Sequence, residues 1–184
     1  MQKSEAIGLL EFGSVARGLQ STDAMLKAAE VQLLLAMPVC AGKFATLVAG
    51  TVASVTSAVA AGETAAEGQV LDRLVLPNVH PQLFPALTGT AQVERVEAIG
   101  VVETFGIAAS VLAADAAAKA ASVTLLEVRL ARGLGGKAYF TLTGTVSAVE
   151  AAVAAACLLV QESGLLVHRT VIPSPHPDLI GFVI

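Results

Sequence analysis

Residues 5–11, EAIGLLE, decide the fold, because the chain contains this segment twice. It returns 92 positions later as EAIGVVE at residues 97–103, and residues 23–29 (DAMLKAA) return at the same spacing as residues 115–121 (DAAAKAA). Between residues 5–34 and residues 97–126, 14 of 30 positions are identical, which is more than a shared richness in alanine explains. Self-similarity at a fixed spacing indicates a repeated structural unit, so the chain is an internal duplication.

The spacing between the copies grows toward the C-terminus. The His-Pro pair at residues 80–81 matches residues 176–177, which lie 96 positions later, so the second copy carries small insertions. One insertion lies beside residues 132–136, which are rich in glycine. We therefore predict a first domain over residues 1–84, a linker over residues 85–95 and a second domain over residues 96–184.

Each copy is predicted to fold as β-α-β-β-α-β. Its short apolar runs are long enough only for strands, whereas residues 15–30 place apolar side chains at helical spacing. Pro38 with Gly42 indicates a turn, and Thr51 is a plausible N-cap. In the first copy the predicted strands are residues 6–11, 31–37, 44–49 and 70–76, and the predicted helices are residues 15–30 and 52–67. The expected fold class is α+β: two tandem, unpermuted ferredoxin-like sandwiches, each with its helices on one sheet.

Composition excludes several classes of protein. The formal net charge is −4 and the pI is near 5.3, which argues against a nucleic-acid partner. Hydrophobic residues reach 55%, with alanine contributing much of that share, but no uninterrupted apolar run approaches the roughly 18 residues of a spanning helix. The N-terminal residues 1–5 (MQKSE) lack the apolar core of a secretory signal. We therefore expect a cytoplasmic protein with no membrane partner.

Charged residues make up only 14% of the chain, and there is no tryptophan. A shortage of surface charge suggests that other subunits cover much of the surface, so we expect an obligate assembly. The alternative is a monomer with a tight alanine-rich core. No catalytic set emerges: there is no Ser–His–Asp context, no Walker-type loop and no helix with two metal-ligating histidines, so we expect no enzyme activity.

Several linked motifs resemble the shell proteins of bacterial microcompartments. They are Glu-Ala-Ile-Gly-x-x-Glu, Asp-Ala-x-x-Lys-Ala-Ala, Gly-Lys before a strand, Gly-x-Val before a helix, and Ile-Pro-x-Pro-His at residues 172–176. The resemblance covers nearly the whole chain twice, although Thr51 and Thr145 stand where the family usually has aspartate. It implies a homotrimer that mimics a hexamer, a pseudohexameric tile, and that packs with other shell proteins into a facet of the compartment shell. An enclosed redox enzyme is a further expected partner.

The resemblance also assigns residues to the edge of the tile. A lysine late in the first helix of each unit lies at the tile edge in this family; the alternative is a solvated lysine favoured by the helix dipole. Asn78 and Ser174 stand where single-domain relatives often carry an edge arginine. The duplicated histidines are expected to be turn or edge residues rather than ligands. The edge residues are thus Lys27, Lys119, Asn78, His80, Ser174 and His176.

The segment between the two middle strands differs between the copies, reading MPVCAGK at residues 37–43 and RLARGLGGK at residues 129–137. The resemblance implies that both loops line a pore at the assembly axis, through Pro38, Val39, Ala41, Gly42, Arg132, Gly133, Leu134 and Gly135. In some tandem-domain relatives, a cysteine in the first loop binds a [4Fe–4S] cluster at the three-fold axis for electron transfer across the shell. Here Cys40 stands in that loop, with Ala41 where proline is expected.

A cluster needs several thiolates, and the chain has only two cysteines, but a three-fold axis would triplicate Cys40. Cys157 lies on an alanine-rich helical segment and is expected in the core. Two alternatives stay open. One is a shell tile with a plain metabolite pore, in which Cys40 is a reduced thiol in a turn. The other is a ferredoxin-like small-molecule-binding sensor that takes its ligand at subunit interfaces.

Overall fold

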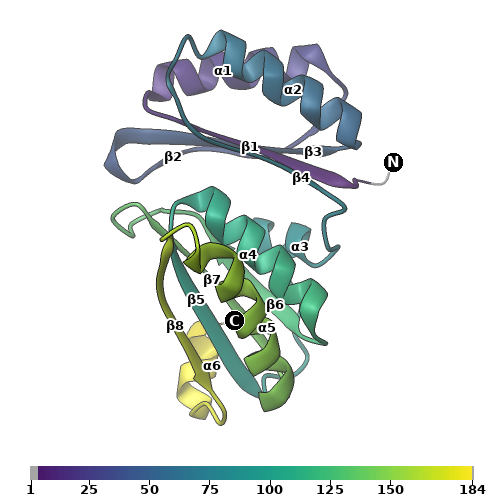
Figure 1. The fold of residues 1–184 in the computed structure, drawn as a ribbon, viewed down its shortest axis with the longest axis vertical. Coiled ribbons are helices and arrows are strands. Elements are labelled where there is room, and N and C mark those ends of the chain that lie inside the picture. The colour runs from purple at the N-terminus through teal and green to yellow at the C-terminus, as the bar shows by residue number, and fades with distance from the viewer. Residues whose placement is uncertain (1–3, 184) are drawn as a thin grey trace. The chain divides into compact units, whose positions relative to one another are not determined.

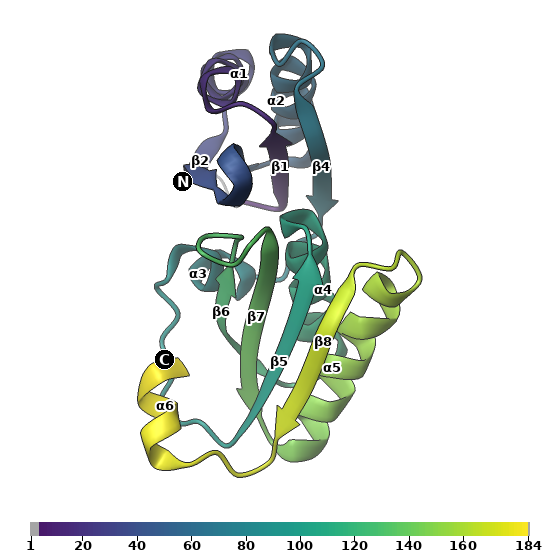
Figure 2. The same cartoon turned by 90° about the vertical axis from the view of Figure 1, so that its left-hand side faces the viewer.

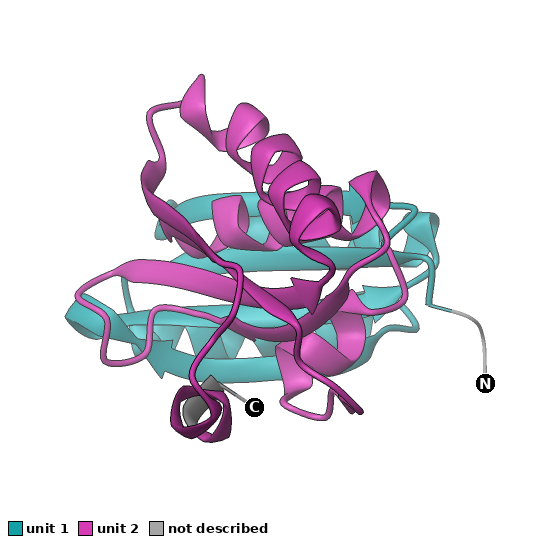
Figure 3. Cartoon of the chain, turned by 90° about the horizontal axis from the view of Figure 1, so that it is seen from below, with its two compact units in different colours: residues 1–79 teal, residues 80–184 magenta. Residues whose placement is uncertain are grey.

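The computed structural model describes residues 4–183 and divides the chain into two compact units, with the boundary between Val79 and His80 (Figure 3). Each unit contains the predicted β-α-β-β-α-β order. The two sheets share one topology, β2-β3-β1-β4 in the first unit and β6-β7-β5-β8 in the second, with antiparallel neighbours throughout. The predicted fold class, two tandem α+β sandwiches, is confirmed.

In the first unit, helices α1 and α2 cover one face of the sheet (Figure 1). Thr51 caps α2 as predicted, its hydroxyl oxygen accepting a hydrogen bond from the N–H of Ser54 at 3.1 Å. The elements are β1 (Ala6–Phe12), α1 (Val15–Ala28), β2 (Gln32–Val39), the single turn η1 (Cys40–Gly42), β3 (Lys43–Gly50), α2 (Val52–Ala65) and β4 (Val70–Pro77).

The turn predicted from Pro38 and Gly42 is present and contains Gly42, but Pro38 itself lies outside it. Pro38 lies inside β2, opposite Phe44 of β3. It is tolerated there because β2 is an edge strand, where a residue without an N–H can face away from the hydrogen-bonded ladder. The turn itself begins only at Cys40.

The second unit repeats the first and adds a helix at its start (Figure 2). The added helix spans the last two residues of the predicted first domain and the start of the predicted linker. It packs against β6 and α4 of the second unit, which begins at His80. The elements are α3 (Leu83–Thr88), β5 (Ala98–Phe105), α4 (Ile107–Ala120), β6 (Thr124–Arg129), β7 (Lys137–Gly144), α5 (Val146–Gln161), β8 (Leu166–Ile172) and α6 (Pro177–Val183).

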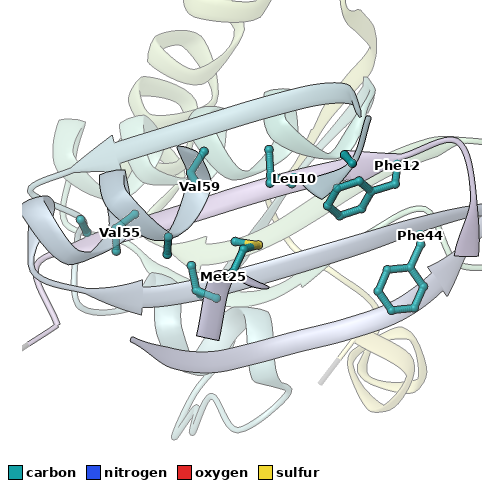
Figure 4. Packing of buried hydrophobic residues seen from close by; sticks show 10 residues of the cluster. Leu10, Phe12, Met25, Phe44, Val55 and Val59 are labelled. Carbon is teal, nitrogen blue, oxygen red and sulfur yellow. The ribbon is translucent and has the colours of Figure 1, made fainter. Parts of the chain in front are cut away.

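The core of the first unit lies between its sheet and its two helices. Figure 4 shows Leu10 and Phe12 of β1, Met25 of α1, Phe44 of β3, and Val55 and Val59 of α2. All are buried, which removes their apolar surface from water and holds the helices on the sheet.

The glycine of the repeated EAIG motif has a packing role in both units. A Cβ atom on Gly8 of β1 would lie only 2.7 Å from the Cγ2 of Val59, and one on Gly100 of β5 would lie 2.8 Å from Val153. Both valines are on the second helix of their unit, so the missing side chain lets that helix lie close to a central strand. The motif is therefore explained by helix–sheet contact rather than by a turn.

Gly100→Ala is expected to lower the free energy of unfolding by about 1–2 kcal/mol, because the added methyl group overpacks the core. Without that clash the substitution would stabilise, since alanine is favoured over glycine in a strand by roughly 0.5–1 kcal/mol. Urea denaturation at one fixed protein concentration measures the effect. Gly13→Ala is the control, because its Cβ would meet only ordinary contacts from 3.4 Å outward. A Gly100→Ala protein as stable as the wild type would contradict the close approach.

Candidate functional site

The Cys40 turn lies at the tip of the β2–β3 hairpin. Cys40 is partly exposed, whereas Val39 before it is buried. The backbone then passes through the left-handed region at Ala41 (φ 65°, ψ 32°) and Gly42 (φ 73°). Such a conformation costs an alanine roughly 1 kcal/mol, and it lets the chain reverse within three residues. The thiol of Cys40 is thus held at a short, tight turn in which Ala41 adopts a strained backbone conformation.

A partly buried ion pair fixes the base of this turn. Lys43, the first residue of β3, places its Nζ 2.8 Å from the Oε1 of Glu11, a carboxylate on β1 that is almost completely buried. The register sets Glu11 opposite Asp72 on β4. Partial burial raises the pKa of the Asp72 carboxyl, and the nearby charge of Glu11 raises it further. Lys43 of β3 therefore pairs with a carboxylate of β1 that has a second acidic residue, Asp72, on its other side, and this pair ties the turn to the central strand.

The equivalent loop of the second unit has the same base and a different tip. Lys137 of β7 pairs with Glu103 of β5 at 2.8 Å, in the same way as Lys43 with Glu11. The loop from 130 to 136 is longer and turns through positive φ at Ala131, Gly133, Gly135 and Gly136. Its tip exposes Arg132 and Gly133 to solvent. This loop therefore carries a cation and glycines where the first unit carries Cys40.

Within the described part of one chain, no set of ligands gathers for a metal. Among residues 4–183, no group of three histidine, cysteine or acidic side chains could hold an ion. Cys157 is buried in α5, so the prediction that it belongs to the core is confirmed. The chain offers Cys40 as its accessible thiol, and a cluster at this turn would need cysteines from several copies.

The two lysines predicted at the tile edge lie in the last turns of α1 and α4. Each pairs with an aspartate one helical turn earlier, Lys27 with Asp23 at 2.6 Å and Lys119 with Asp115 at 2.5 Å. The Asp-x-x-x-Lys spacing is typical of such pairs, so the repeated motif already contained the signal for both carboxylates. Asp115 is buried and also accepts a hydrogen bond from the backbone N–H of His80 at 2.7 Å.

The other predicted edge residues lie just after the last strand of each copy. Asn78, exposed and with φ 52°, follows β4, and Ser174, also exposed, follows β8. His80 and His176 begin the turns that lead into α3 and α6, and each ring Nδ1 accepts the N–H of the residue two positions later. Both histidines are therefore turn residues, and the edge role of this group stays a prediction.

Between residues 4 and 183, none of the helices combines the length and the apolar character needed to cross a bilayer.

Comparison with known proteins shows the family. Residues 6–79 and 98–175 each match the family model of the BMC domain, one match for each repeat. The chain belongs to the BMC-domain family.

Relatives of this BMC-domain protein are shell proteins of bacterial microcompartments. It is 46% identical over 176 residues to the shell protein PduT of Citrobacter freundii, covering 96% of both chains. It is 42% identical over 84 residues to the shell protein EutM of Salmonella typhimurium, covering 46% of this chain and 85% of EutM. The crystal structure of a microcompartment protein from Desulfitobacterium hafniense DCB superimposes with a TM-score of 0.94 at 50% identity, covering 97% of this chain and 99% of that one.

These comparisons confirm the predicted likeness to tandem-domain shell proteins, including the T subunit of the propanediol-utilisation shell. The BMC-domain protein is a structural shell protein of a bacterial microcompartment and not an enzyme. They also set aside the sensor alternative, because the relatives are shell components along the full length of the chain.

Proposed function

We propose that this BMC-domain protein is a trimeric, pseudohexameric shell tile whose three Cys40 turns lie around the three-fold axis and hold one [4Fe–4S] cluster. The observation that carries the proposal is the placement of Cys40, partly exposed at the tip of a hairpin whose base is fixed by a partly buried ion pair. A thiol at such a tip is accessible to an iron–sulfur cluster, unlike Cys157 in its helix.

The chemistry of the donor set fits this cofactor in three copies. A [4Fe–4S] cluster is usually held by four cysteine thiolates, one for each iron. Three chains supply three of them and leave the fourth iron for water, a solute or another ligand. Ala41 carries only a methyl group and Gly42 no side chain, so both leave room beside the thiol for the turns of neighbouring chains. When bound, the cluster would supply a one-electron redox centre for transfer between an enclosed redox enzyme and a carrier outside the shell.

A second candidate is a tile whose central pore passes small metabolites while Cys40 remains a reduced thiol. The loop from 130 to 136 favours it, because glycines and an exposed arginine suit an open passage better than a ligand set. Iron content after anaerobic reconstitution separates the two candidates.

Packing with other shell proteins is proposed to use the Lys27 and Lys119 edges. Lys27 is the cleaner residue to test, because Lys27 and Asp23 are both exposed, whereas Lys119 pairs with a buried carboxylate. Removing Lys119 would leave the Asp115 charge buried without its cation, which destabilises a fold.

Lys27→Gln is expected to abolish flat sheets in electron micrographs while leaving a trimer of three 18.6 kDa chains, about 56 kDa, in light scattering. The substitution removes the ammonium group and keeps most of the side-chain length. Arg95→Gln is the control, since it removes the same charge from an exposed position before β5. Undiminished sheets from Lys27→Gln would contradict the edge role, and a monomeric mass for the wild type would contradict the trimer.

A further inference from the structure

Helix α3 packs in the second unit on a surface formed by α4 and the start of β6, called here the seat of α3 (Figure 2). The backbone N–H of His80, just before α3, donates to the buried Asp115 of α4 at 2.7 Å. The Gln82 side chain bonds the edge of β6 twice, donating from Nε2 to the Val123 carbonyl at 3.1 Å and accepting from the Leu125 N–H at 2.9 Å. Leu83, the first residue of α3, is completely buried.

Helix α6 is the counterpart of α3 in the second repeat, and it has the same local structure. At the repeat spacing of 96, His176, Asp178 and Leu179 correspond to His80, Gln82 and Leu83. The Leu179 N–H donates to the His176 carbonyl at 2.9 Å, as the Leu83 N–H does to the His80 carbonyl. Yet Leu179 is 40% exposed where Leu83 is 0% exposed, and the side chains of His176 and Asp178 are largely in solvent. The two helices therefore have the same local structure, but only α3 is packed against a neighbouring surface.

The first unit has a surface on α1 and β2 that corresponds to the seat of α3 on α4 and β6, but no helix among residues 4–183 covers it. At the repeat spacing of 92, Asp23 corresponds to Asp115 and Leu33 to Leu125. The Asp23 side chain is 61% exposed against 4% for Asp115, and Leu33 is 40% exposed against 1% for Leu125. The outer face of α1 adds two exposed leucines, Leu19 and Leu26, where α4 has buried Val111 and Ala118. The face made by α1 and β2, called here the open seat, thus presents an apolar patch beside a carboxylate.

We propose that α6 of one chain docks on the open seat of a second copy of this chain. The His176 N–H would donate to Asp23 of the neighbouring copy, and the Asp178 carboxylate would accept the Leu33 N–H, as Gln82 accepts that of Leu125. Asp178 has no donor, so the second bond that Gln82 makes, to the Val123 carbonyl, has no equivalent at Val31. Leu179 would cover the exposed leucines.

The order of the repeats along the chain selects a second copy as the occupant. Helix α3 follows the last strand of the first repeat and is seated on the repeat that comes next in the chain. Helix α6 follows the last strand of the second repeat, and the repeat that comes next in a ring of chains is the first repeat of a neighbour. The contact is therefore head to tail, the kind that closes into a ring. The inference rests on the proposed trimer and gives it six equivalent seats, three within chains and three between them.

The test is chemical crosslinking of Gln32→Cys/Asp178→Cys protein with a short bis-maleimide, in a Cys40→Ser/Cys157→Ala background. The expected products are covalent dimers and trimers on a denaturing gel. The matched control is Thr124→Cys/Gln82→Cys, which places the thiols at the corresponding positions of the seat within one chain and must crosslink without changing the chain number. Purely intramolecular crosslinks in the first variant, or none while the control reacts, would overturn the docking of α6 on a neighbour.

A second variant covers the case in which the cysteine background folds poorly. Leu33→Glu changes a residue that is exposed in the single chain, so it leaves the fold of the monomer intact. It is expected to weaken the trimer, so that the protein concentration below which the trimer dissociates rises at least about tenfold. Leu158→Glu, on an exposed position of α5, is the control. Unchanged dissociation of Leu33→Glu contradicts the inference while the trimer stands. A monomeric wild type contradicts the trimer itself, so the two failures are distinguishable.

Discussion

Cys40→Ser is expected to remove the iron and the visible absorbance together from protein reconstituted under anaerobic conditions. One [4Fe–4S] cluster in each trimer corresponds to about 1.3 iron atoms per chain, and the variant should fall to the background value. The loss is complete because one substitution removes every thiolate at the axis. Iron analysis and absorbance spectra of the wild type and the variant, prepared side by side, measure it.

Cys157→Ala is the matched control, because it removes the other thiol of the chain and keeps a small apolar side chain in the core. It should keep both the iron and the colour. Cys40→Ser should keep the trimer mass, since oligomer interfaces of this kind are wide and one turn is a small part of them. Iron retained by Cys40→Ser, or lost by a still trimeric Cys157→Ala, contradicts the assignment. A colourless wild type after careful reconstitution leaves the plain metabolite pore as the function.

Phe44→Ala is expected to lower the free energy of unfolding by about 3–5 kcal/mol. Phe44 follows the Cys40 turn on β3, is 2% exposed, and packs where α1 has Gly18. A Cβ atom on Gly18 would lie 2.5 Å from the Cδ1 of Phe44, so the ring fills the space that this glycine leaves. Removing the ring opens a cavity between β3 and α1. The predicted loss is large, because the free energy of unfolding of a whole protein is typically only about 5–15 kcal/mol.

Urea denaturation followed by circular dichroism measures this change. Leu71→Ala on β4 is the control for truncation outside the core, because more than half of Leu71 is exposed, and it should cost less than about 1 kcal/mol. A Phe44→Ala protein that unfolds at the urea concentration of the Leu71→Ala protein would contradict the packing of the hairpin against α1.

The repeated motifs predicted the fold because they carry the alternation of strands and helices twice, and an error in one copy is corrected by the other. The linker was harder to read. Residues 81–88 contain Pro81 and Pro85, which break a helical pattern, so α3 shows only once its contacts with α4 and β6 are known. The position of Pro38 inside a strand could not be predicted for a related reason. Its meaning depends on whether β2 is an edge strand, and strand order is not written in the local sequence.

The candidate site was predictable in its residues and not in its geometry. Cys40 stands out because the second copy lacks it. The left-handed conformation of Ala41 is not a preference of alanine, and it follows from the closing of the hairpin around it. Glu11 and Lys43 each belong to a repeated motif, but their pairing follows from the register of β1 against β3, a tertiary property. The same holds for Asp115, whose burial depends on α4 and α3 together.

The unequal loops of the two units have a consequence for what such a tile can evolve. In a ring of six identical single-domain chains, every substitution in a pore loop appears six times at the axis, so a residue that is useful in three copies and harmful in six cannot be kept. A duplicated chain separates these choices. In the proposed trimer the turn with Cys40 and the glycine loop from 130 to 136 can each mutate alone, and the central opening gains chemistry at alternate positions while the others preserve its width.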